Sequence, residues 1–189
     1  MCPLLKLNAK AGTPVAEAVM ETPEILLQAR RFRVEQVVQV AKDGSRHTRE
    51  VVRHPGAVVI LPLLSDGRIC FVRNFRIAVR ETLIELPAGT LEAGEDPAET
   101  ALRELAEETG YRAGRIRRLL EFCMSPGILD ERMHLFLAED LRLGEMALEG
   151  GEEIEPFLAS WDEALGMIER GEIRDAKTLV GLLYYGRLR

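Results

Sequence analysis

Hydrophobic and polar residues alternate along several short stretches of the chain, and this period of two is typical of β-strands that bury one face. One stretch, residues 56–64, is almost entirely apolar, which favours a strand buried on both faces. Turn residues at positions 42–44 and 66–67 separate neighbouring stretches and predict two hairpins. The stretches expected to form strands are residues 32–40, 47–54, 56–64, 68–75, 83–86, 115–124 and 133–141.

The pattern changes to helical signals at three places. Residues 97–109 follow Asp96, a capping residue, and stop at Gly110, which can adopt a left-handed conformation. Two more helices are expected near the C-terminus, one after Ser160 and one after Asp175. Strands around an internal helix, with helices at the end, predict an α+β fold of the α/β/α sandwich type.

Length and composition favour one main domain. A chain of 189 residues with 47% hydrophobic residues can bury one sizeable core. We expect residues 1–54 to form an N-terminal extension with an antiparallel hairpin and residues 55–189 to form the main domain. Residues 1–30 show only weak periodicity, so no regular element is predicted there.

Charge and hydropathy narrow the class of partner. The net charge of −6 argues against nucleic acid and anionic membranes, because no positive field attracts a polyanion. The longest apolar run, residues 57–64, is too short to span a bilayer, and the N-terminus has no apolar core of signal-peptide length. Three scattered cysteines show no metal-ligand spacing. A cytoplasmic protein is therefore expected.

The expected helix at 97–109 carries an acidic motif. At 100° per residue, Glu104 and Glu108 lie together on one flank and Glu107 lies one step further round. The fixed residues fit the pattern G-x5-E-x7-R-E-U-x-E-E-x-G-U, where U is aliphatic: Gly89, Glu95, Arg103, Glu104, Glu107, Glu108 and Gly110. Tyr111 occupies the last U position of this pattern, where its side chain is larger than the usual aliphatic one.

These carboxylates repel one another, at about a few tenths of a kcal/mol per pair on an isolated helix. A divalent cation reverses the sign of that interaction, and an oxygen-only ligand set suits Mg²⁺ or Mn²⁺. The alternative for Glu-x-x-Glu-Glu alone is a solvated acidic helix face. Together with Gly89 and Glu95 upstream, the pattern favours the metal site.

The pattern is the Nudix box, and from about Val51 to Leu183 the chain resembles the Nudix hydrolases, with the ADP-ribose pyrophosphatase branch most similar. The lead-in ELPAG at residues 85–89 and VRNFR at residues 72–76 support that branch. The resemblance implies a mixed sheet with a catalytic loop–helix–loop. It also implies Mg²⁺-dependent hydrolysis of ADP-ribose to AMP and ribose 5-phosphate, with Mn²⁺ able to substitute.

The resemblance also assigns roles to residues. The Ala88 carbonyl, Glu104 and Glu108 are expected to hold the metals, and Glu107 assists them. Arg103 is expected to keep Glu104 and Glu107 in register.

A glutamate outside the helix is expected to orient or deprotonate the attacking water. The resemblance favours Glu152, with Glu153 and Glu149 as neighbours, although on composition alone this acidic loop is simply solvated. The residues expected to bind substrate are Arg53, Arg73, Arg76, Glu85, Gly89, Pro126, Gly127 and Glu131.

Two of these expectations have a plain structural alternative. Strand alternation puts Arg73 and Arg76 on opposite faces, so a shared phosphate site requires a bend near Asn74. Pro126 and Gly127 together are ordinarily just a turn.

The same motifs allow other substrates, and the resemblance also implies an oligomeric state. GDP-mannose or another nucleotide sugar would suit nearly every motif, whereas the ELPAG lead-in disfavours a nucleoside-triphosphate sanitiser. Intact box carboxylates disfavour a non-catalytic ligand sensor. The resemblance further implies a homodimer in which residues 32–54, with Phe32, Arg33, Glu35 and Arg53, contact the partner.

Overall fold

The computed structural model describes residues 22–41, 43–148 and 153–189. The chain separates into two compact units with the boundary between Val52 and Arg53. The expected boundary at residues 54 and 55 lies two residues further along the chain. Arg53, the last residue of the strand that ends the first unit, therefore falls in the second unit.

The N-terminal unit is a three-stranded sheet in the order β1-β2-β3. The expected hairpin is present as β2 (Arg33–Val40) and β3 (Arg46–Arg53), and the Ala41 N–H donates to the Ser45 carbonyl at its turn. Strand β1 (Glu24–Gln28), which pairs antiparallel with β2, was not predicted from the sequence. All five residues of β1 are exposed, so burial imposes no alternation on its sequence.

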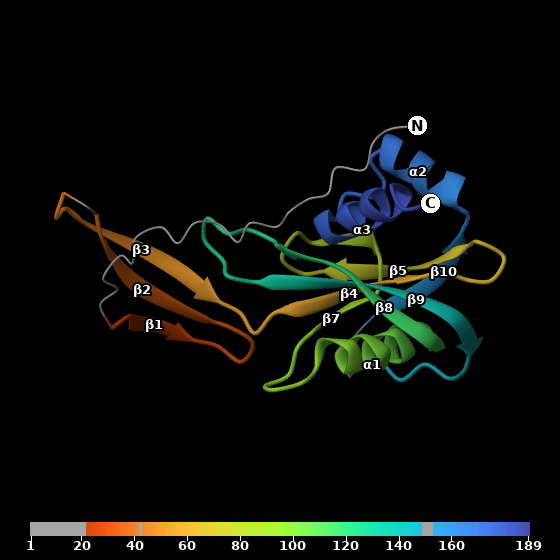
Figure 1. Cartoon of the computed structure of the whole chain (residues 1–189), viewed down its shortest axis with the longest axis horizontal. Coiled ribbons are helices and arrows are strands. Elements are labelled where there is room, and N and C mark those ends of the chain that lie inside the picture. Colours follow the sequence, from red (N-terminus) through yellow and green to blue (C-terminus); the bar gives the residue numbers. More distant parts are fainter. Residues whose placement is uncertain (1–21, 42, 149–152) are drawn as a thin grey trace. The chain divides into compact units, whose positions relative to one another are not determined.

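The second unit contains two sheets (Figure 1). The four-stranded sheet has the order β7-β4-β9-β8, and its central pair β4 and β9 is parallel whereas the outer pairs are antiparallel. The three-stranded sheet has the order β10-β5-β6. The expected mixed sheet is therefore confirmed. The strand bounds are β4 (Ala57–Pro62), β5 (Ile69–Arg76), β6 (Glu81–Glu85), β7 (Ala88–Thr90), β8 (Tyr111–Cys123), β9 (Arg132–Leu143) and β10 (Ile154–Ala159).

The expected second hairpin was wrong in its pairing. The turn at residues 64–68 does form, with the Leu64 N–H donating to the Arg68 carbonyl. Beyond one bridging pair, Leu63 and Ile69, the two strands enter different sheets. Every residue of β4 is buried, so this strand needs a neighbour on each edge, and β7 and β9 take those edges.

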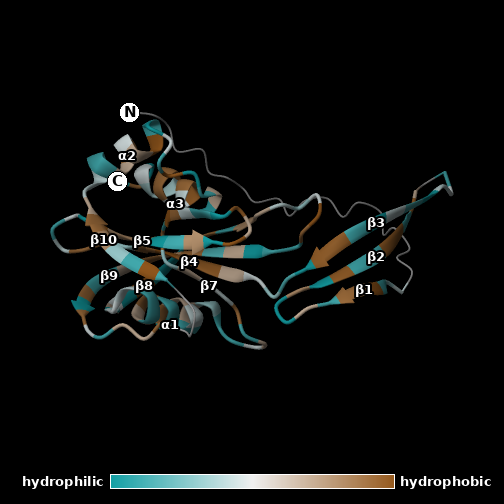
Figure 2. Ribbon diagram, turned by 180° about the vertical axis from the view of Figure 1, so that it is seen from behind, coloured by the Kyte–Doolittle hydropathy of each residue, from teal (hydrophilic) through white to brown (hydrophobic). Residues whose placement is uncertain are grey.

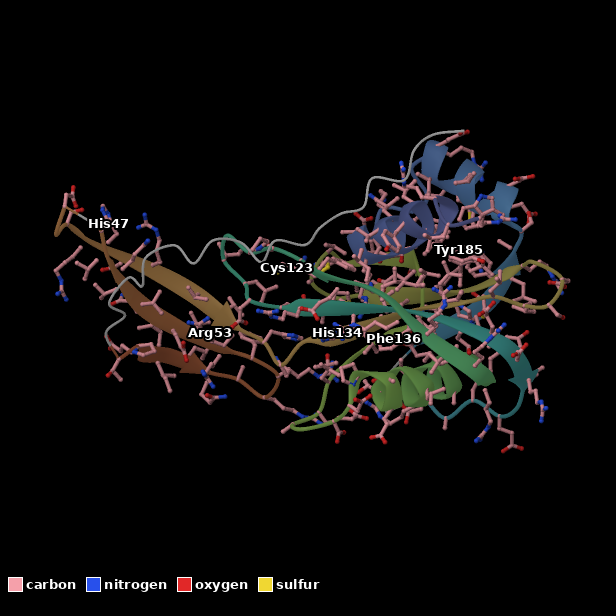
Figure 3. All side chains as sticks on the ribbon, viewed as in Figure 1. His47, Arg53, Cys123, His134, Phe136 and Tyr185 are labelled. Atoms are coloured by element: carbon pink, nitrogen blue, oxygen red, sulfur yellow. The ribbon has the colours of Figure 1, made fainter. Side chains whose placement is uncertain are left out.

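Helices cover both faces of the four-stranded sheet (Figure 1). On one face α1 (Pro97–Thr109) packs on a cluster that contains Val58, Ile60, Leu105 and Phe136. Phe136 is labelled in Figure 3. On the other face α2 (Trp161–Glu169) and α3 (Ala176–Gly186) contribute to the larger core.

The apolar residues of the chain are concentrated in the strands that lie between the helical layers, such as β4 and the central part of β9 (Figure 2). The layers match the expected α/β/α sandwich, and the Ser160–Glu163 capping box forms as predicted. Tyr111 is partly buried against the cluster beneath α1, as a packing residue. No helix in the described part of the chain is long and apolar enough to cross a membrane.

Strand β10 was not predicted because residues 145–155 appear only as an acidic stretch in the sequence. It contains Pro156, which lacks an N–H group. An edge position tolerates that loss, and β10 is an edge strand beside β5.

Candidate active site

Helix α1 begins and ends where its sequence predicts. The Asp96 side chain accepts a hydrogen bond from the Ala98 N–H, and Pro97 occupies the first turn. Gly110 ends the helix with φ of 73°, and its N–H donates to the Ala106 carbonyl. These local signals set where the helix begins and ends, and the helical repeat then sets the direction in which its carboxylates project.

Arg103 lies at the centre of the acidic cluster. Its guanidinium donates to both carboxylate oxygens of Glu95 at 3.2 Å, and to Glu104 and Glu107 at 2.9 Å each. The hydrogen bond to Glu95, ahead of the other contacts, raises the pKa of Arg103. The bond from Arg103 likewise lowers the pKa of Glu95. Arg103 thus bonds to both Glu104 and Glu107, and its role in keeping them in register stays a prediction.

Two carboxylates of α1 converge on the backbone at Ala88 and Gly89. Glu108 is only 4% exposed and accepts a hydrogen bond from the Ala88 N–H at 3.1 Å. The Glu104 side chain lies directly against Gly89, because a Cβ added there would be 1.9 Å from the Glu104 carboxyl carbon. Only glycine leaves room for Glu104 in this position.

The donor set at this convergence fits a hard divalent cation. Glu104, Glu107, Glu108 and the backbone at Ala88 offer oxygen atoms, with no sulfur or imidazole in the described site. Among the described residues, no three acidic, histidine or cysteine side chains form a ready-made cation site. Instead, Arg103 supplies the positive charge next to Glu104 and Glu107.

Glu85 and Arg76 form a paired unit at the end of the three-stranded sheet. Glu85 is 1% exposed and accepts two hydrogen bonds from Arg76, at 2.7 and 2.6 Å. Burial by itself raises the pKa of Glu85, but the bonds from Arg76 and the positive charge of Lys177 outweigh it and lower the pKa overall. Glu85 therefore orients Arg76, whose side chain is 41% exposed.

Arg73 lies on the opposite face of β5 from Arg76. The pairing of β5 with β6 is continuous through Asn74, so the bend required for a shared site is absent. Arg73 instead stacks over the Phe157 ring at 4.2 Å and lies 3.7 Å from the Glu155 carboxylate. The structure does not bring the two arginines together.

The loop between β8 and β9 holds three of the expected substrate residues. Pro126 and Gly127 are exposed in a turn closed by bonds to the Ser125 carbonyl. Glu131 lies 3.5 Å from the Nδ1 atom of His54.

Arg53 is anchored beside this loop, because it donates to Asp130 at 3.1 Å. Asp130 also accepts from the His54 N–H. Arg53, Glu131 and the turn thus lie in one neighbourhood.

Three glutamates were expected to include the residue that activates water. Two of them, Glu149 and Glu152, lie outside the described residues. Glu153 is exposed and immediately precedes β10.

Two residues next to the site escaped sequence reasoning. Lys177 and Thr178, in the first turn of α3, bond to Glu85 and to the Leu86 N–H respectively. Asp175, recognised as a helix start, was the only local signal for them. Their partners are 92 residues away in sequence, which no local pattern reports.

Comparison with known proteins agrees with this geometry. The family model described as the NUDIX domain matches residues 52–180. A crystal structure described as an ADP compounds hydrolase shares the fold with a TM-score of 0.80 at 22% identity, covering 90% of this chain and 93% of that chain.

Three sequence relatives cover similar shares of the chain. ADP-ribose pyrophosphatase of Bacillus subtilis (strain 168) is 43% identical over 144 residues, covering 75% of this chain and 78% of the relative. Methanol dehydrogenase activator of Bacillus methanolicus is 41% identical with the same coverage. GDP-mannose pyrophosphatase of Escherichia coli O1:K1 / APEC is 39% identical over 155 residues, covering 76% and 81% respectively.

Proposed function

Because this chain belongs to the Nudix family and is a Nudix hydrolase, we propose that it hydrolyses the pyrophosphate bond of ADP-ribose. The products are AMP and ribose 5-phosphate. Water adds across one P–O bond of the diphosphate bridge, so each phosphorus ends as a monophosphate. Two protons are released when both products are dianions.

One observation carries this proposal: Glu104 and Glu108 converge from α1 on the Ala88–Gly89 backbone. A solvated acidic helix face would not bury Glu108 to 4% exposure or bring Glu104 into contact with Gly89. The 43% identity to an ADP-ribose pyrophosphatase supports the choice of substrate.

Nudix hydrolases use divalent metal ions, and we assign Mg²⁺ here, with Mn²⁺ as a substitute. The Ala88 carbonyl, Glu104 and Glu108 would hold it, assisted by Glu107. When bound, such an ion neutralises phosphate charge and lowers the pKa of bound water. Since Arg103 bonds to Glu104 and Glu107, it keeps these carboxylates oriented.

We assign phosphate binding to Arg76. Its bonds to Glu85 use two of the five guanidinium N–H groups, which leaves other donors for a phosphate oxygen. Gly89 belongs to the same site through its contact with Glu104.

Arg73, Arg53, Glu131 and the Pro126-Gly127 turn remain candidates for the nucleoside and sugar ends. For them the support is the family resemblance and, for the last three, a shared neighbourhood.

We assign water activation to Glu152, with Glu153 and Glu149 beside it in sequence. If Glu152 is the base, Glu152→Gln lowers kcat by ~10²-fold or more with a small change in KM. Glu153→Gln is the matched control. An unchanged kcat in Glu152→Gln moves the base to another residue.

A nucleotide-sugar substrate such as GDP-mannose is the second candidate, supported by the 39% identity to a GDP-mannose pyrophosphatase. The metal site contacts only the diphosphate, which both substrates share. The discriminating experiment measures product release with Mg²⁺ from ADP-ribose, GDP-mannose, other nucleotide sugars, dinucleotides and triphosphates. A preference for triphosphates, or no turnover of any compound, would contradict the proposal.

We also propose a cytoplasmic homodimer that uses the N-terminal strands. Three consecutive apolar residues of β1, Ile25, Leu26 and Leu27, are each about half exposed on an edge strand. Edge strands with exposed apolar side chains favour pairing with another chain. Of the expected contact residues, Phe32 is exposed, whereas Glu35 is buried and accepts a bond from Arg33 within its own unit.

A further inference from the structure

The short segment Leu86–Ala88 connects β6 to the proposed metal site, and three separate elements hold its backbone. The Leu86 N–H donates to the Thr178 hydroxyl of α3 at 2.8 Å. The Pro87 carbonyl accepts from the Ile60 N–H of β4 at 2.8 Å, and the Ala88 N–H donates to Glu108 of α1. Of these three contacts, only the one to Glu108 comes from the acidic motif.

Thr178 links this segment to the start of α3 through two hydrogen bonds of its hydroxyl. Its side chain is fully buried, and its hydroxyl donates to the Asp175 carboxylate at 2.7 Å while accepting from Leu86. Asp175 also caps α3 by accepting from the Thr178 N–H. Loss of the hydroxyl would leave the Leu86 N–H buried without a partner, a loss that is costly in a protein interior.

Lys177 provides a second tie between the same two elements. Its ammonium binds Asp175 at 2.9 Å and also binds the buried carboxylate of Glu85, at the end of β6. Lys177 is 7% exposed, and it is the only lysine after residue 42 in a chain otherwise rich in arginine. A compact ammonium suits a small buried space between two carboxylates better than a planar guanidinium does.

Close packing completes the contact between α3 and the segment. A Cβ at Gly181 would lie 2.7 Å from the Leu86 side chain, so the helix approaches Leu86 as nearly as a glycine permits. Helix α3 and helix α1 lie on opposite faces of the sheet (Figure 1). The segment that carries the Ala88 carbonyl is therefore fixed from both faces.

We infer that Thr178 is a positioning residue of the pyrophosphatase site: through the Leu86 N–H it sets the place of the Ala88 carbonyl, and Lys177 supports it through Asp175 and Glu85. This inference rests on the proposed function in one respect, the assignment of Ala88 as a metal ligand. Nothing in the acidic motif itself involves α3, so the role extends the site beyond that motif.

The test compares Thr178→Val, which keeps the shape and removes the hydroxyl, with Thr178→Ser, which keeps the hydroxyl. Binding of Mn²⁺ to the purified full chain, without substrate, is measured by electron paramagnetic resonance. Thr178→Val is expected to bind Mn²⁺ about 10-fold more weakly, the size of effect seen for groups that orient metal ligands, whereas Thr178→Ser stays close to wild type. The concentration of Mg²⁺ needed for half-maximal activity should rise in parallel, with the KM for ADP-ribose little changed.

A merely structural role would lower the melting temperature of Thr178→Val and leave Mn²⁺ affinity unchanged at temperatures where the protein is folded. That result overturns the inference. If Thr178→Val does not fold, Thr178→Ala replaces it, because it also removes the hydroxyl that accepts from the Leu86 N–H. Unchanged Mn²⁺ binding in Thr178→Ala then overturns the inference.

The inference and the proposed substrate fail separately. If wild type does not cleave ADP-ribose but binds Mn²⁺, and Thr178→Val binds it more weakly, the positioning role stands and the substrate is wrong. If wild type cleaves ADP-ribose and Thr178→Val binds Mn²⁺ equally well, only the positioning role is wrong. Failure of wild type to bind Mn²⁺ overturns both the metal assignment and the inference.

Discussion

At the scale of single residues, burial decides what a charged side chain does. Glu107 and Glu108 are neighbours in sequence, yet Glu107 bonds to Arg103 at 28% side-chain exposure while Glu108 is buried against the Ala88 backbone. Glu85 and Glu155 differ in the same way, since one is enclosed by Arg76 and Lys177 and the other is 74% exposed. Such differences determine which carboxylates are held in a fixed position.

Replacement of Glu108 by glutamine tests the metal role directly. The Gln side chain can still accept the Ala88 N–H, so the fold should be kept, but it loses the charge that a cation requires. We expect kcat to fall at least ~100-fold at saturating Mg²⁺, with the far-ultraviolet circular dichroism unchanged. Substantial residual turnover would remove Glu108 from the metal site.

Gly89→Ala tests the close approach of Glu104. The added Cβ would lie 1.9 Å from the Glu104 carboxyl carbon, so the side chain must rotate away. Displacement by about 1 Å can cost ~10²-fold in rate, and we expect a fall in kcat of that order with preserved folding. The control is Gly166→Ala in α2, where only the flexible end of Arg170 lies nearby, at 2.8 Å. Equal activities of the two variants would contradict this reading.

His134 should give the protein a pH-dependent stability. Burial and then the charge of Arg118 lower the pKa of His134 below 6.5, although Glu121 opposes them. The unfolded chain therefore binds more protons than the folded chain as the pH falls below about 6.5, so stability decreases there and levels off below the folded-state pKa. Figure 3 labels this side chain on β9.

The measurement is the free energy of unfolding in urea across mildly acidic pH. His134→Gln should show a flatter profile than wild type over the interval just below about pH 6.5, because glutamine does not titrate. Parallel profiles for the two proteins would exclude His134 as the source of the slope.

At the scale of elements, local signals positioned the helices, and long-range pairing positioned the strands. Asp96, Ser160 and Asp175 cap the three helices where the sequence predicts, because a cap needs only residues within one turn. The strands β4 and β5 follow one another through a predicted turn, yet they enter different sheets. Strand partners depend on which edges are buried, and a turn does not specify that.

The cap of α1 offers a prediction at this scale. Asp96→Ala removes the acceptor for the Ala98 N–H and should cost about 1 kcal/mol in the free energy of unfolding. Asp96→Asn keeps an acceptor oxygen and should retain most of that stability. Urea unfolding of the three proteins measures the difference, and identical midpoints would show that the cap is dispensable.

At the scale of the whole molecule, the catalytic unit is a sandwich in which every layer contributes to one short backbone segment. The acidic motif comes from α1, the Pro87 carbonyl is held by β4, and Thr178 comes from α3. The N-terminal unit is a separate sheet with an exposed apolar edge. This exposed apolar edge is the surface through which we propose that two chains associate.

The proposed homodimer predicts a solution mass of two chains by light scattering. Ile25→Glu puts a charge on the exposed edge strand β1 and should shift the mass toward one chain. Leu143→Glu is the control, since Leu143 is equally apolar and 73% exposed but lies on β9. A wild-type mass of one chain, or an unchanged dimer in Ile25→Glu, would contradict the use of β1.

The sequence by itself determined the helix α1, its caps and the family, because these depend on residues within a few turns of one another. It also indicated that Glu104 and Glu108 share a flank. Strand alternation indicated opposite faces for Arg73 and Arg76 unless β5 bends near Asn74, and the sequence did not show whether that bend exists. The pairing of β5 with β6 runs without interruption through Asn74, so the two arginines stay on opposite faces.

Only the tertiary structure decided the burial of Glu108, the pairing of Glu85 with Lys177, and the hold of Thr178 on Leu86. Each of these joins residues from different elements, and the last two span 92 positions of the chain. Contacts at that separation arise from the packing of layers, and packing depends on shape and burial across the whole core rather than on any local periodicity.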